Sequence, residues 1–247
     1  SLVNKLLERL RKTNRQTQMI FCPTWYWGDG TEPTQQKYLE ELAQELHRDV
    51  YLFWTGDGIT GGITAGAAKT FKEISQHRVI LWDNYPVNDN APTMHLGPVT
   101  GRAPELGRIL DGYMSNPMCK QNQINRLPLL TCADYAYNPQ AYDPVRSIGQ
   151  AILTFSNTPE QQSVLKDLVD AYPGFILCNG GTGYNPVLER AKKIFSEPHS
   201  RIVVLAYIKH LEDLSTRFDS AFPSQYAPEK ETLRNDIRWL QEQMDLQ

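Results

Sequence analysis

Long apolar runs are missing from this sequence, and their absence excludes an integral membrane protein built of helices. No stretch approaches the roughly 20 apolar residues that a membrane-spanning helix requires. A signal peptide is not visible either, but the chain opens at Ser1 rather than Met, which leaves open that an N-terminal segment was removed. We therefore expect no membrane partner.

Clusters of basic residues are missing as well. The formal net charge is -3, and Lys and Arg are spread along the chain. A nucleic-acid-binding protein ordinarily carries a concentrated positive patch, so we expect no nucleic-acid partner. With 40% hydrophobic and 21% charged residues, the composition is that of a folded globular protein and excludes disorder.

Cysteine and histidine are scarce and scattered. The five histidines show no metal-ligand spacing, so we expect no metal, and no motif implies a cofactor. The four cysteines form no C-x-x-C pair, and we expect free, buried thiols in a reducing, cytoplasmic setting. They are Cys22, Cys119, Cys132 and Cys178. The segment Gly180–Gly183 lacks the lysine of a P-loop and the spacing of a dinucleotide fingerprint, so it predicts a turn.

What the sequence does contain is an alternation of apolar runs and amphipathic segments. Three short runs predict strands, and a fourth is a strand candidate: Gln18–Cys22, Val50–Trp54, Arg78–Trp82 and Leu127–Leu130. Helical periodicity surrounds them, over 2–12, 34–46, 64–76, 104–112 and 144–155. The first helix has no capping residue before it, which is typical of a chain cut near a helix start. The alternation predicts a parallel α/β sheet of about four strands, either half of an eightfold barrel or a small open sheet.

Beyond residue 157 the pattern is helical. Amphipathic spacing predicts helices over 161–171, 186–195, 201–214 and 229–244. We therefore expect two parts, an α/β domain over residues 1–157 and a helical appendage over residues 158–247.

Side chains that suit a sugar follow the predicted strands. In parallel α/β folds, ligands bind at the carboxyl ends of the strands. Those ends mix aromatic rings with amides and carboxylates, in Pro23–Gly28, Trp54–Gly56, Trp82–Asp89 and Thr131–Pro139. An aromatic face packs on the apolar face of a pyranose, while Asn and Asp bind its hydroxyls. Four such ends in register favour a carbohydrate site.

A structural role is the alternative for these residues. A single Trp or Tyr after a strand commonly packs in a core. Carboxylates such as Asp83 and Asp134 can cap loops or pair with an arginine such as Arg102. The pattern alone leaves both interpretations open.

One segment is long and ordered enough to indicate a family. Trp82–Asp89 resembles the signature of glycoside hydrolase family 84, which comprises O-GlcNAcases, bacterial β-N-acetylglucosaminidases and hyaluronidase-like enzymes. Further segments similar to that family are Phe21–Thr24 with Tyr26, Trp54–Gly56, His95–Pro98, Gly101-Arg102 and Ser115–Met118. The resemblance runs from Ser1 to near Ile152.

The resemblance implies the C-terminal half of a (β/α)8 TIM barrel followed by a helical region. It also implies retaining hydrolysis of terminal β-linked N-acetylglucosamine, in which the sugar's own acetamido group is the nucleophile. In the family, two adjacent aspartates at the end of the fourth strand carry the proton transfers. Our first predicted strand matches the family's fifth, and the sequence contains no Asp-Asp pair. We therefore expect no catalytic residue in this chain and no activity of the chain alone.

Five residues match substrate-binding positions of the family, by resemblance alone. Tyr26 resembles the tyrosine that contacts the reacting acetamido group, and Trp82 the tryptophan that lines the pocket. Asn84 resembles the asparagine that supports the acetamido group and the acid. Asp89 resembles the aspartate that grips hydroxyls on the far side of the ring, and Asn116 the asparagine at the pocket rim that also binds hydroxyls.

Two positions depart from the family pattern. Trp25 stands where the family often has an acidic residue, and Asp57 follows Gly56 where a proline is common. These departures bear on fine specificity rather than on the class of enzyme.

Three functions fit this sequence. The chain is part of an active glycosidase, a non-catalytic carbohydrate-binding module, or a structural interaction protein that retains the scaffold. The expected ligand is an N-acetylglucosamine-containing glycoconjugate. Because a half barrel leaves two strand edges unpaired, the expected protein partner is the missing N-terminal half or a second copy of the chain.

Overall fold

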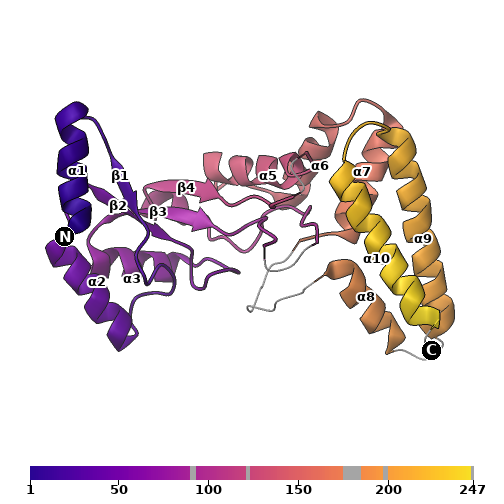
Figure 1. Cartoon of the computed structure of the whole chain (residues 1–247), viewed down its shortest axis with the longest axis horizontal. Helices are drawn as coiled ribbons and strands as arrows, with labels where there is room; N and C mark the ends of the chain where they lie inside the picture. The colour runs from indigo at the N-terminus through magenta and orange to yellow at the C-terminus, as the bar shows by residue number, and fades with distance from the viewer. Residues whose placement is uncertain (90–92, 121–122, 175–184, 197–199, 246–247) are drawn as a thin grey trace.

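The protein is described from a computed structural model, which covers residues 1–89, 93–120, 123–174, 185–196 and 200–245. An α/β part lies at the N-terminal end of an elongated molecule, and a group of long helices lies at the other end (Figure 1). The α/β part contains α1 (Leu2–Thr13), β1 (Met19–Phe21), α2 (Pro33–Glu45), β2 (Val50–Trp54), α3 (Ala65–Ser75), β3 (Arg78–Asp83), α4 (Leu106–Ile109), β4 (Gly112–Ser115) and α5 (Arg126–Tyr137). The remaining helices are α6 (Pro144–Thr154), α7 (Pro159–Ala171), α8 (Pro186–Phe195), α9 (Ser200–Ala221) and α10 (Ala227–Asp245).

The sheet has four parallel strands in the order β1-β2-β3-β4. Strands that follow one another in the sequence are therefore neighbours in space, which is the order of consecutive βα units in a barrel. Among the described residues, β1 and β4 each have one unpaired edge. The fold is that of half a (β/α)8 barrel, as predicted.

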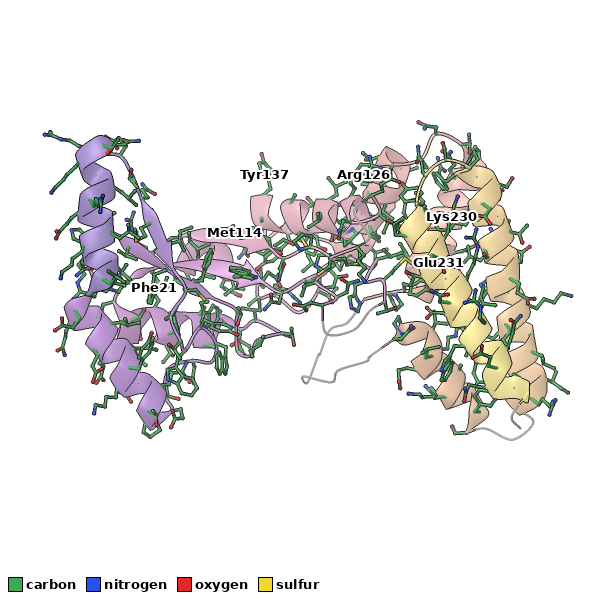
Figure 2. All side chains as sticks on the ribbon, viewed as in Figure 1. Phe21, Met114, Arg126, Tyr137, Lys230 and Glu231 are labelled. Atoms are coloured by element: carbon green, nitrogen blue, oxygen red, sulfur yellow. The ribbon has the colours of Figure 1, made fainter. Side chains whose placement is uncertain are left out.

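The two faces of the sheet differ in how well they are covered. Residues of β2 and β3 alternate between buried and half-buried, and the buried set, which includes Leu52 and Leu81, packs toward the helices. The opposite face would line the inside of a closed barrel. There Ile20 is 40% exposed and Met114, labelled in Figure 2, is 48% exposed. Parallel sheets ordinarily bury both faces, so this inner face lacks its cover among the residues that the structure describes.

The fourth strand is not where we predicted it. It is β4, which has no apolar run, whereas the candidate Leu127–Leu130 lies in α5. The buried positions of α5 include Leu127, Thr131 and Tyr135, and this spacing of four belongs to a helix, not a strand. The helix predicted over 104–112 shrinks to α4 because Gly112 already pairs with Ile80 in the sheet.

Two smaller predictions are also wrong. The first helix does have a cap, because the Ser1 side chain accepts a hydrogen bond from the Asn4 amide at 3.3 Å. Cys22 and Cys119 are exposed rather than buried, since Cys22 follows the edge strand β1, and Cys119 lies in a surface loop. Cys132 is free and buried as expected. Cys178 and Gly180–Gly183 lie outside the described residues.

The predicted helices beyond residue 157 are present as α7 to α10, and they share one core with the loops of the sheet. This core includes Met94 and Leu96 from the connection after β3, and Met118 and Ile124 from the connection after β4. The boundary at 157/158 stays a prediction, but the loops after β3 and β4 are fastened to the helical part. No helix in the described ranges is long and apolar enough to cross a membrane.

Candidate functional site

Two predicted sugar ligands meet at the carboxyl ends of β3 and β4. Asn84 directly follows β3 and Asn116 directly follows β4. The Asn116 Nδ2 donates to the Asn84 Oδ1 at 3.0 Å, and the Asn84 Nδ2 donates to the Ile59 carbonyl at 2.7 Å. The Asn116 backbone amide also donates to the Asp83 carbonyl at 2.9 Å, which extends the ladder between the strands. The two side-chain amides are therefore held in a fixed relation at the mouth of the half barrel.

An indole ring stands beside this amide pair. Trp82 lies on the inner face of β3, half-buried, with its ring edge-on to Phe53 at a centroid distance of 4.9 Å. Its register partner on β4 is Met114, whose side chain is 48% exposed. Rings and thioethers give an apolar surface, and amides give donors and acceptors, which together match the two characters of a pyranose.

The other two predicted ligands lie farther along the rim. Tyr26 follows β1, so β2 separates it from β3, and its carbonyl accepts from the Thr55 amide at the end of β2 at 2.8 Å. Its half-buried ring packs against Trp27 at 4.9 Å. Asp89 is exposed in the loop after β3. The structure thus brings Trp82, Asn84 and Asn116 together, with Tyr26 and Asp89 on flanking loops.

A buried ion pair lies at the end of β3, on the face of the sheet that packs against the helices. Asp83 and Arg102 have side chains only 1% and 3% exposed, joined through two hydrogen bonds, Nε to Oδ2 at 2.9 Å and an η nitrogen to Oδ1 at 2.5 Å. The Tyr113 hydroxyl also donates to Oδ2 at 2.8 Å. Burial works to lower the pKa of Arg102, but the adjacent carboxylate outweighs it and raises that pKa above its ordinary value. Burial and the same carboxylate raise the pKa of Tyr113.

The structural alternative is therefore confirmed for Asp83. It faces the helices, and the strand alternation turns Trp82 the other way, toward the inner face. Asp134 lies within α5 rather than at a strand end, so the expectation that it follows a strand is wrong.

Sequence reasoning missed the residues that fix the rim loops. The Tyr85 hydroxyl, fully buried, donates to the Gly97 carbonyl at 2.6 Å, and the Ser115 hydroxyl donates to the Tyr85 carbonyl at 2.6 Å. The buried Asn88 accepts from the Cys119 amide at 2.8 Å through its side-chain oxygen. The alternation of half-buried and buried residues holds from Trp82 to Tyr85, so a period of two could have placed Tyr85 on the buried side. It could not have done so for Asn88, because residues 85–88 are all buried.

The departure at Asp57 has a local explanation. Its carboxylate accepts from both the backbone amide and the hydroxyl of Thr64, each at 2.8 Å, and Thr64 caps the N-terminus of α3. The preceding Gly56 has φ of +115°, a conformation that glycine tolerates best. The loop after β2, which also carries the Ile59 carbonyl, is therefore tied to α3.

Titratable groups near the site give no metal cluster. Within the described ranges, no group of three His, Cys, Asp or Glu side chains is arranged to hold an ion. His95 is buried, and this burial lowers its pKa to about 4, so it is neutral at pH 7. Burial likewise raises the pKa of the Cys132 thiol to about 11. The chemistry of the site is thus that of amides, rings and one exposed carboxylate.

Comparison with known proteins gives the same family as the motifs. The model of the beta-N-acetylglucosaminidase (NAGidase) family matches residues 1–170. A mutant of the Thermobaculum terrenum O-GlcNAc hydrolase is similar in structure, with a TM-score of 0.73 and 26% identity, over 98% of this chain and 52% of that one. CpGH84B shares the fold at a TM-score of 0.66 and 22% identity, over 96% of this chain and 43% of that one. The chain spans about half the length of these structures. It belongs to the beta-N-acetylglucosaminidase family, the family 84 glycoside hydrolases that its motifs resemble.

Proposed function

We propose that this chain is part of a retaining β-N-acetylglucosaminidase and contributes the sugar-binding side of its pocket. The observation that carries the proposal is the Asn84–Asn116 pair beside Trp82 at the carboxyl ends of β3 and β4. The sheet has four parallel strands in consecutive order, and one similar protein, of which this chain covers 52%, is an O-GlcNAc hydrolase by name. A terminal, β-linked N-acetylglucosamine on a glycoconjugate is the ligand.

The proposed reaction is substrate-assisted. The acetamido oxygen of the sugar attacks the anomeric carbon as the glycosidic bond breaks, and a general acid protonates the leaving oxygen. The resulting oxazoline is opened by water, which restores the β-configuration. The family's proton-transferring residues are an Asp-Asp pair, which this sequence does not contain, so another part of the complete protein supplies them.

In this scheme the residues of the chain bind and orient. Asn84 and Tyr26 contact the acetamido group, and Trp82 lines the pocket. Asp89 and Asn116 accept from or donate to the ring hydroxyls. A hydrogen bond to a charged group contributes about 1.5–3 kcal/mol, so Asp89 is the strongest single contact of the set.

Kinetics of the complete barrel test these roles. In a protein that carries the preceding four strands, Asp89→Ala should lower kcat/KM by about 10- to 150-fold, with much of the loss in KM. Asn116→Ala should lower it less, because a neutral hydrogen bond is weaker. Glu73→Gln, on the exposed face of α3, is the matched surface control. Unchanged kinetics in Asp89→Ala and Asn116→Ala would remove the assignment.

A non-catalytic carbohydrate-binding module is the second candidate. The absence of an Asp-Asp pair favours it for the chain acting alone. Binding of N-acetylglucosamine without turnover by the complete natural protein would support this candidate over the first. A scaffold that only mediates protein contacts would bind no sugar.

The uncovered inner face supports a further part of the proposal, on assembly. Ile20 and Met114 are exposed on the face that a closed barrel would bury, and within the described part of the chain β1 and β4 each have an unpaired edge. The chain should therefore associate with the other half of the barrel or, without it, with a second copy. Size-exclusion chromatography with light scattering measures this, and a cooperatively unfolding monomer would contradict it.

A further inference from the structure

The connection after β4 is described at residues 116–120 and 123–125, and it begins with the proposed ligand Asn116 and ends against the helical part. Its two described ends are joined by one side chain: the Asn125 Oδ1 accepts from the Met118 amide at 3.0 Å, and its Nδ2 donates to the Met118 carbonyl at 2.9 Å. Asn125 is buried. Whatever holds the end of this loop therefore also holds Met118, two residues from Asn116.

The first turn of α10 and the residue before that helix, Tyr226, hold this end of the loop. The Glu229 Oε1 accepts from the Ile124 amide at 3.2 Å, across 105 residues of sequence. In the opposite sense, the Gln123 Oε1 accepts from the Tyr226 amide at 2.8 Å. Both Glu229 and Ile124 are 0% exposed. Two reciprocal hydrogen bonds thus fasten the loop to the N-terminus of α10.

Burying the carboxyl group of Glu229 at this place costs free energy. Among the described residues its second oxygen, Oε2, has no hydrogen-bond partner, and burial raises the pKa of its carboxyl group. The adjacent Lys230 is directed elsewhere, to the Phe222 carbonyl at 2.5 Å and to Asp219 at 3.5 Å. Across the two parts of the chain, the Glu229 carboxyl group is held by backbone amides of the loop after β4, those of Ile124 and Gln123.

We propose that Glu229 is a positioning residue for the sugar site, which acts on Asn116 by fixing residues 123–125 to the helical part and, through Asn125, also Met118. The inference rests on the proposed function, since it takes Asn116 as a sugar ligand. It assigns the helices a role in binding: they hold the rim of the pocket from a position outside the barrel. The same core supports this, because Met118 and Ile124 pack in one cluster with Tyr226 and Leu233.

Residue-resolved amide hydrogen exchange on this chain tests the mechanical step without sugar. Glu229→Ala should speed exchange at Ile124 and Met118 by about 10- to 100-fold, because the carboxyl oxygen that accepts from the Ile124 amide is lost. Glu229→Gln keeps an oxygen at the same position and should restore most of the protection. Glu231→Ala, at an exposed site on α10 that Figure 2 labels, should change neither amide.

Two further variants separate positioning from general loss of stability. Leu240→Ala removes a buried side chain of α10 remote in sequence from the turn, and should destabilise the chain without the local effect. Gln123→Ala cuts the reciprocal bond from the exposed side of the loop and should repeat the effect if Glu229→Ala does not fold. Equal exchange changes in Glu229→Ala and in Leu240→Ala would overturn the proposal, as would no change in Gln123→Ala.

The sugar step is measured on the complete barrel. Glu229→Ala should raise KM for a β-N-acetylglucosaminide severalfold and alter kcat less, and Glu229→Gln should return KM toward its original value. If Asn116→Ala raises KM and Glu229→Ala does not, the positioning role is wrong while the proposed function stands. If Asn116→Ala itself leaves KM unchanged, the assignment of Asn116 fails, and the inference falls with it.

Discussion

The buried pair of Asp83 and Arg102 allows the sharpest prediction of stability. Asp83→Asn keeps the shape of the side chain but removes its charge, which leaves a guanidinium that is 3% exposed without its counterion. Removing one partner of a buried ion pair costs about 3–5 kcal/mol. For a chain of this length that corresponds to a fall of roughly 6–20 °C in Tm.

Urea unfolding followed by circular dichroism measures the effect. Glu73→Gln is the control, because its ion pair with Lys69 is exposed and of the i,i+4 type, worth about 0.3–0.5 kcal/mol. Replacing both partners, Asp83→Asn with Arg102→Met, should cost less than the sum of the single changes, since no charge is then left unpaired. A loss in Asp83→Asn no larger than in Glu73→Gln would refute the reasoning.

Three other outcomes are expected. The isolated chain should not hydrolyse an aryl β-N-acetylglucosaminide, and turnover that Asp89→Ala abolishes would disprove this. Gly97→Ala should lower the free energy of unfolding by about 1–3 kcal/mol or more, because the new Cβ would lie 1.8 Å from the Pro173 carbonyl oxygen. Gly66→Ala in α3 is the control, because its Cβ would meet nothing within 4 Å. In thermal melts this control should be neutral or stabilising by up to about 1 kcal/mol. Burial raises the pKa of the Glu229 carboxyl group in the folded state, so protonation at low pH stabilises the folded wild type. This stabilisation is lost as the pH rises through the folded-state pKa. The free energy of unfolding of Glu229→Gln relative to wild type should therefore increase from about pH 4 to about pH 7, and a constant difference would contradict this.

Local patterns predicted the first three strands and most helices. Val50–Trp54 is an uninterrupted apolar run of the kind that a buried parallel strand requires, and it was found with its bounds unchanged. Gly112–Ser115 is a strand because it pairs with β3, and no local feature of its sequence predicts this pairing. Leu127–Leu130 was misjudged because a run of four apolar residues fits a strand or a buried helix equally well.

The candidate site, too, was only partly predictable from local sequence. The motif Trp82–Asp89 contains three of the five residues that we propose as ligands, namely Trp82, Asn84 and Asp89. The choice between a structural and a binding role for Asp83 needed the position of Arg102. The contact between Asn84 and Asn116 joins residues 32 apart, and the contact of Glu229 with Ile124 joins residues 105 apart. Such pairs depend on how the elements pack, so motif spacing could not supply them.

The central claim is that the rim of β3 and β4 binds N-acetylglucosamine. Titration of the isotope-labelled chain with N-acetylglucosamine, followed by NMR, tests it most directly. With only part of the pocket present we expect binding at about millimolar strength, equivalent to about 4 kcal/mol. We expect the shifts to gather at the side-chain amides of Asn84 and Asn116 and at the Trp82 indole, and we expect Asn116→Ala to weaken them. Saturating sugar that moves none of these three signals, or moves signals of the helices alone, would contradict it.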